Sequence, residues 1–169
     1  MENASVTNFG EKKSESSTTS TAQGLDDHQK DTIRKALVDT AIKLLGIPYV
    51  YGAEVTDFTK IPTELDCSEL VKYVYHVNGL RMVDGSQNQF NFTVHSPSPR
   101  AGDLAFFGRG AKIDQIYHVG MVLDTESIIE ARAFDPTASF KTGEVITRPI
   151  KKWMDYKSFV GFRCSPKLL

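Results

Sequence analysis

The residues best placed to do chemistry lie around Cys67, one of two cysteines among 169 residues. Asp66 before it is a preferred N-cap type, and apolar residues recur after it at helical spacing. We therefore predict a helix that begins at Cys67 and stops near Asn78-Gly79. In the first turn, free backbone N–H groups and the helix dipole favour a thiolate, the nucleophile of acyl-transfer reactions. The alternative is a small buried apolar cysteine.

A cysteine nucleophile needs a base within hydrogen-bond reach, and the chain has four histidines. His28 borders the N-terminal tail, and His95 lies in a proline-rich loop. His76 falls on the helix face opposite the cysteine. His118 opens a predicted strand, which can hold an imidazole rigidly across from a helix N-terminus. A histidine at the start of a strand is also a common structural residue, so its role stays open.

The ring of His118 would need a partner on its second nitrogen to fix its orientation. The segment from Ile128 to Ala131 has the pattern of a hairpin partner for the His118 strand, and it contains Glu130. A carboxylate there can orient the imidazole. The alternative is an ordinary solvent-facing strand residue, which spacing alone favours.

Composition limits the function classes. Hydrophobic residues make up 40% and charged residues 24%, as in ordinary globular proteins. The net charge of −1 argues against nucleic-acid or anionic membrane partners. Two distant cysteines make neither a disulfide framework nor a zinc site. No apolar run reaches the roughly 18 residues of a membrane span, and the N-terminus has no signal-peptide pattern.

The chain divides into a tail and one domain. In residues 1–26 the stretch from Ser14 to Ala22 holds seven Ser or Thr residues out of nine, which predicts disorder. A tether or docking arm is the functional alternative. Residues 27–169 are predicted as a single folded domain.

The predicted elements of this domain change character along the chain. An amphipathic helix is expected from His28 to Leu45, with Gly46 at its end, and a short helix near residues 84–92. Later segments have the pattern of strands: Leu104–Phe107, Tyr117–Leu123, Ser127–Ala131, Glu144–Arg148 and Phe159–Cys164. Helices first and strands afterwards predict an α+β domain with an antiparallel sheet.

Over roughly residues 30–164 the chain resembles the NlpC-type papain-fold cysteine peptidases, which cut bacterial cell-wall peptides. Each matching segment is weak alone, and the order and spacing of four carry the resemblance. They are Gly46-Ile47-Pro48-Tyr49-Val50-Tyr51-Gly52, Asp66-Cys67-Ser68, Ala101-Gly102-Asp103-Leu104-Ala105-Phe106-Phe107 and His118-Val119-Gly120-Met121-Val122. The resemblance implies N-terminal helices packed on a five- to six-stranded antiparallel sheet.

The resemblance also implies roles for single residues. Cys67 matches the nucleophile, and His118 matches the base that later protonates the leaving amine. Glu130 falls where the family carries its third polar residue, often a histidine. Tyr49 matches a tyrosine whose hydroxyl helps to hold the oxyanion.

The implied substrate is the peptidoglycan stem peptide, cut between γ-D-glutamate and a diamino acid. Asp66 and Ser68 match positions that contact its amine and carboxylate. Neither a metal nor a cofactor is implied. Two readings compete with a thiol endopeptidase: a non-catalytic member within a phage tail or secretion assembly, and an amidase or acyltransferase of the same fold. The tail is then a candidate docking arm, and the protein is expected to reach the wall either as part of a virion or by a non-standard export route.

Two departures from the family pattern stand out. Glu69 replaces a glycine that usually follows Asp-Cys-Ser, and the loop Ala53–Leu65 replaces a shorter, glycine-rich loop. A carboxylate beside the thiolate would oppose its ionisation and raise the pH optimum. The alternative is that Glu69 faces away from the site, because residues two apart on a helix point about 200° apart.

Overall fold

The computed structural model describes residues 24–135 and 142–169. Within them lie four α-helices: α1 (Asp27–Ile42), α2 (Cys67–Val77), α3 (Ser86–Phe92) and α4 (Ile150–Met154). They also contain six strands: β1 (Val94–His95), β2 (Leu104–Gly108), β3 (Ile116–Val122), β4 (Ser127–Ala133), β5 (Gly143–Pro149) and β6 (Phe159–Cys164). The predicted tail falls almost wholly outside the described residues, so its disorder and its docking role stay predictions.

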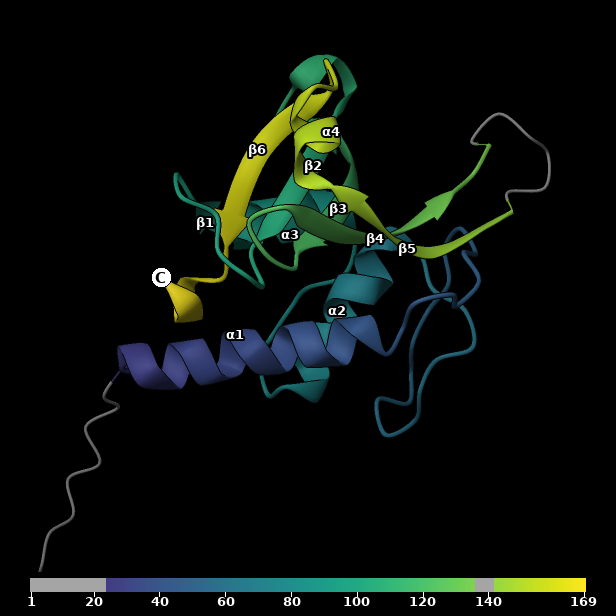
Figure 1. The fold of residues 1–169 in the computed structure, drawn as a ribbon. Coiled ribbons are helices and arrows are strands. Elements are labelled where there is room, and N and C mark those ends of the chain that lie inside the picture. The colour runs from purple at the N-terminus through teal and green to yellow at the C-terminus, as the bar shows by residue number, and fades with distance from the viewer. Residues whose placement is uncertain (1–23, 136–141) are drawn as a thin grey trace, which may run out of the picture.

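The strands form one antiparallel sheet in the order β1-β6-β2-β3-β4-β5. Helices α1 and α2 lie along one side of this sheet (Figure 1). The predicted α+β class and antiparallel sheet are therefore confirmed. The five predicted strands correspond to β2 to β6, with bounds that differ by at most two residues.

Strand β2 is buried on both faces of the sheet. Leu104 and Phe106 enter the main core beneath α1 and α2, whereas Ala105 and Phe107 enter a second core. The second core is closed by Trp153 of α4, which is 0% exposed. The sequence did not predict α4, because its start at Pro149 carries no side-chain cap.

Two predictions of local structure are wrong, the end of the first helix and the loop around His95. Helix α1 ends at Ile42 and not at Leu45, because the backbone tightens into bonds three residues apart, such as Leu44 N–H to the Ala41 carbonyl at 3.0 Å. Gly46 then takes a φ of +81°. His95 lies in strand β1 and not in a loop, because residues 94–95 pair with the distant strand β6.

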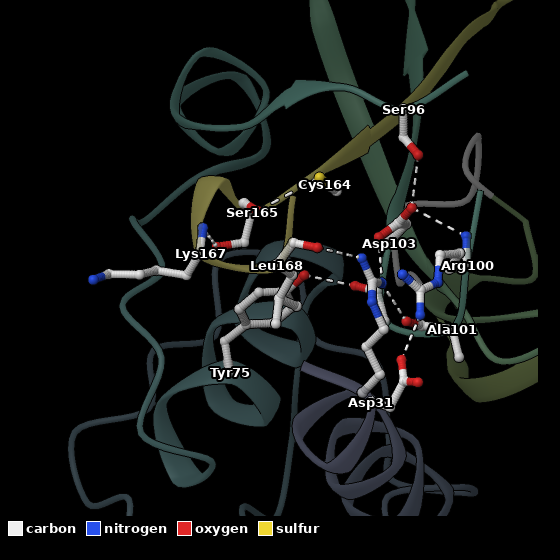
Figure 2. A network of polar contacts seen from close by, with 12 residues as sticks. Asp31, Tyr75, Ser96, Arg100, Ala101, Asp103, Cys164, Ser165, Lys167 and Leu168 are labelled. Carbon is white, nitrogen blue, oxygen red and sulfur yellow. Dashed lines mark hydrogen bonds and ion pairs between the residues drawn. The ribbon is translucent and has the colours of Figure 1, made fainter. Parts of the chain in front are cut away.

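A buried polar network joins the first helix to the C-terminal end of the chain. Arg34 of α1 donates to Asp103 at 2.6 Å and to the Leu168 carbonyl at 2.9 Å. Asp103 also accepts the Ser96 hydroxyl at 2.7 Å, and Tyr75 donates to the Gly102 carbonyl at 2.6 Å (Figure 2). The Ala101-Gly102-Asp103 segment therefore has a structural role: it links α1, α2 and the C-terminal residues.

No helix among the described residues is long and apolar enough to cross a membrane. The same residues contain no group of three or more His, Cys, Asp or Glu side chains arranged to hold a metal ion.

Candidate active site

The predicted nucleophile stands at the first residue of α2. The Asp66 carboxylate caps this helix by accepting the backbone N–H groups of Ser68 at 2.9 Å and Glu69 at 2.8 Å. The apolar face of α2, which includes Leu70, packs into the main core and fixes the helix against the sheet. Cys67 is 8% exposed and borders a groove, so it is neither fully buried nor free in solvent.

His118 of β3 lies between the thiol and a carboxylate. Its Nε2 is 2.6 Å from Glu130 Oε2, and the Cys67 sulfur lies within hydrogen-bonding reach of the ring. Because Nε2 faces Glu130, Nδ1 is the ring nitrogen left to face the sulfur. Burial alone would lower the pKa of His118, but the Cys67 thiolate and Glu130 outweigh it and raise the pKa to about 10. This arrangement favours the imidazolium form of His118.

Glu130 of β4 is a buried carboxylate with three donors around it. Besides His118, its Oε1 accepts Arg148 Nη1 of β5 at 3.0 Å and Trp153 Nε1 of α4 at 3.3 Å. Burial would raise the pKa of Glu130, but His118 and Arg148 lower it overall. At 1% exposure Glu130 is not the solvent-facing residue that spacing alone favoured.

Sequence reasoning missed Arg148 and Trp153. Trp153 also stacks on Phe107, with ring centroids 4.4 Å apart, and lies 5.5 Å from the His118 ring. A Cβ on Gly120 would come within 2.7 Å of Trp153, so glycine is required at that position in β3. Trp153 is the only tryptophan in the chain, which was a usable signal, whereas nothing in the sequence marks Arg148.

Tyr49 is held in place by its backbone. Its N–H donates to the Gly143 carbonyl at 2.8 Å, and the residue forms an isolated bridge with Leu65 just before the nucleophile helix. Burial, followed by the negative charges of Cys67 and Asp66, raises the pKa of Tyr49 to about 12. The hydroxyl therefore keeps its proton at neutral pH and can donate a hydrogen bond to an oxyanion near the sulfur.

All six residues predicted for the site line one open groove of about 1070 Å³: Tyr49, Asp66, Cys67, Ser68, His118 and Glu130. The groove is large enough for several residues of a peptide. Asp66 and Ser68 also bond to each other, since the Ser68 hydroxyl donates to Asp66 Oδ1 at 2.9 Å. Asp66 therefore caps the helix with the same oxygen that holds Ser68.

Glu69 does not line this groove. Its carboxylate accepts the Val55 backbone N–H at 2.8 Å and the Lys72 ammonium at 2.9 Å. Of the two alternatives for Glu69, the structure favours the one in which it faces away from Cys67.

Comparison with known proteins agrees with this geometry. Protein P54 of Enterococcus faecium is 33% identical over 114 residues, which is 65% of this chain and 20% of that protein. Peptidoglycan endopeptidase RipB of Mycobacterium tuberculosis is 29% identical over 117 residues, which is 64% of this chain and 44% of that protein. The chain thus spans less than half the length of either relative.

Solved structures and a family model extend the comparison. The NlpC/p60 domain of the peptidoglycan hydrolase SagA matches with a TM-score of 0.57 and 26% identity, covering 78% of this chain and 97% of that one. The sequence model of the NlpC/P60 family matches residues 46–158, which is more than half of the chain. The matched range includes all six residues predicted for the site, from Tyr49 to Glu130. This chain belongs to the NlpC/P60 family.

Proposed function

We propose that this protein is a peptidoglycan hydrolase, and more narrowly a thiol endopeptidase of stem peptides. The observation that carries the proposal is the imidazole of His118 held between the Cys67 sulfur and the buried Glu130 carboxylate, at the centre of an open groove. Membership of the NlpC/P60 family supports the substrate class, since relatives are a peptidoglycan endopeptidase and a peptidoglycan hydrolase.

The proposed reaction begins with attack of the Cys67 thiolate on the amide carbonyl carbon. A C–S bond forms and the carbonyl oxygen becomes an oxyanion, which the Tyr49 hydroxyl and the Cys67 backbone N–H stabilise. Collapse of this intermediate breaks the C–N bond, and the His118 imidazolium gives its proton to the leaving amine.

Water completes the cycle. The neutral His118 takes a proton from water as the oxygen attacks the thioester, and cleavage of the C–S bond returns the thiolate and releases the acid. Glu130 keeps the ring oriented and stabilises the imidazolium at both stages. Every proton and bond is accounted for by the chain and one water molecule.

The proposed scissile bond joins γ-D-glutamate to a diamino acid such as diaminopimelate. Asp66 and Ser68 border the groove beside Cys67. We propose that they contact the amine and carboxylate of the peptide. Asp66 Oδ1 is engaged in the helix cap. We therefore expect the other carboxylate oxygen, Oδ2, to face the amine.

Digestion of purified sacculi, with mass spectrometry of the soluble fragments, tests the proposal. We expect peptides that begin with a free diamino acid from the wild type, none from Cys67→Ala, and normal release from the matched control Cys164→Ala. Release of intact stem peptides would instead identify an amidase. Sacculus binding without any release would identify a non-catalytic member. Equal release from Cys67→Ala would contradict the thiol mechanism.

A further inference from the structure

The two departures from the family pattern meet in space. Glu69 lies on α2 and is 1% exposed, and its Oε2 accepts the backbone N–H of Val55 at 2.8 Å. Val55 belongs to the Ala53–Leu65 loop, and its side chain is packed in the main core. A glycine at position 69 would offer no acceptor to this N–H. The carboxylate and the loop are therefore complementary features of one arrangement.

The same carboxylate reaches a second segment through Lys72. The Lys72 ammonium donates to Glu69 Oε1 at 2.9 Å and to Asp84 Oδ1 at 3.2 Å. Gln89 adds a neutral link, since its Nε2 donates to the Val83 carbonyl at 3.0 Å and to the Ser68 carbonyl at 2.8 Å. Residues 83–84 are thus tied to the first turns of α2.

Both tied segments continue into the groove wall. Tyr51 and Gly52 precede the loop held by Glu69, and Gly85 and Ser86 follow Asp84 directly; all four line the groove. Tyr51 is 75% exposed and projects as a rim residue. We call Tyr51-Gly52 and Gly85-Ser86 the two rims of the groove. The contacts of Glu69 and Lys72 thus connect the loop that follows the first rim to Asp84, which precedes the second.

We propose that Glu69 and Lys72 are positioning residues that clamp the two rims of the groove and thereby set the affinity for the peptide. This inference rests on the proposed function for its kinetic consequence, but the clamp itself is a feature of the fold. Tyr49 has its own backbone anchors at Gly143 and Leu65, so loss of the clamp should leave the oxyanion donor in place. The clamp should act on KM and leave kcat nearly unchanged.

The decisive variant is Glu69→Ala, which leaves the Val55 N–H and the Lys72 ammonium without their buried acceptor. The double variant Glu69→Gln with Lys72→Met restores an amide acceptor for Val55 and removes the unbalanced cation. Asp26→Ala is the matched control, because it removes the side-chain cap of α1 far from the groove and destabilises the fold by another route.

The rate of limited trypsin digestion reports how firmly the Ala53–Leu65 loop is held, since Lys60 lies in that loop with its side chain 81% exposed. We expect faster cleavage after Lys60 in Glu69→Ala, and rates near wild type in the double variant and in Asp26→Ala. On a γ-D-glutamyl-diaminopimelate peptide, KM should rise roughly tenfold in Glu69→Ala, with kcat within about threefold of wild type. The double variant should recover only part of this loss, because Lys72→Met still removes the tie to Asp84.

Unchanged cleavage after Lys60 in a cooperatively folded Glu69→Ala overturns the clamp. So does an equal rise of KM in Asp26→Ala, because that would trace the effect to stability alone. If the wild type cleaves no such peptide, the proposed function fails, while accelerated cleavage after Lys60 still supports the clamp.

Discussion

Replacement of Glu130 by glutamine is the sharpest perturbation of the proposed site. The amide keeps the size of the carboxylate and removes its charge, so two charge-assisted contacts weaken: the one to His118 at 2.6 Å and the one to Arg148 at 3.0 Å. A hydrogen bond to a charged group contributes about 1.5–3 kcal/mol. The imidazolium should therefore lose about that much stabilisation.

This loss should leave His118 protonated at neutral pH but should move the basic limb of the pH profile of kcat/KM. Cys67 and Glu130 raise the pKa of His118 to about 10, which is more than two pH units above pH 7.5. Because the expected loss is smaller than this margin, His118 stays protonated at neutral pH. The imidazolium is the acid that protonates the leaving amine, so activity falls as pH rises through its pKa. The basic limb of kcat/KM should consequently lie near pH 10 in the wild type and move down by roughly one to two pH units in Glu130→Gln.

At neutral pH the expected effect is a fall in kcat of about tenfold with little change in KM, less than in His118→Ala, because the ring is less firmly oriented. Asp103→Asn is the matched control. It breaks another buried ion pair, Arg34–Asp103 at 2.6 Å, with similar burial but no contact with the groove. Both variants should lower the free energy of unfolding by about 3–5 kcal/mol. A basic limb that moves equally in both, or in neither, would refute the role of Glu130.

Three further variants or probes test other parts of the site. Iodoacetamide near neutral pH should label Cys67, which borders the groove, before Cys164, which is 2% exposed within the sheet; labelling of Cys164 first would contradict the thiolate. Tyr49→Phe should lower kcat about 10- to 100-fold at every pH up to about 11, because the hydroxyl stays protonated below its pKa of about 12. Gly120→Ala should lower the melting temperature and kcat together, since the added methyl would meet Trp153 at 2.7 Å; unchanged melting would show that the ring adapts freely.

The nucleophile and its helix could be predicted from the sequence because their signals are local. Asp66 caps the N–H groups of the residues two and three positions later, Ser68 and Glu69, and the apolar residues of α2 repeat within eleven positions. Strands β2 to β6 could be predicted from the sequence equally well, since each has a compact apolar pattern between turn residues. The pairing of Cys67 with His118 came from the resemblance, because position along a strand does not by itself fix what faces a helix.

The environment of Glu130 could not be predicted, because it depends on residues far along the chain. Strand alternation alone cannot tell a solvent-facing carboxylate from one covered by a later helix. That cover is α4, a five-residue helix without a capping side chain, and it follows β5 directly. Glu69 illustrates the same limit. Helical periodicity offered the alternative in which Glu69 faces away from Cys67, but it could not show that Glu69 accepts the backbone N–H of Val55, fourteen residues earlier in the chain.

The proposed site and the second core of the sheet therefore form one structural unit. Trp153 closes that core by stacking on Phe107, and its indole N–H donates to the carboxylate that orients His118. Displacement of the indole would leave Glu130 with one donor fewer and the ring of His118 with one wall fewer. Substitutions in the second core should for this reason change the reaction rate through Glu130, although no apolar side chain of that core needs to contact the substrate.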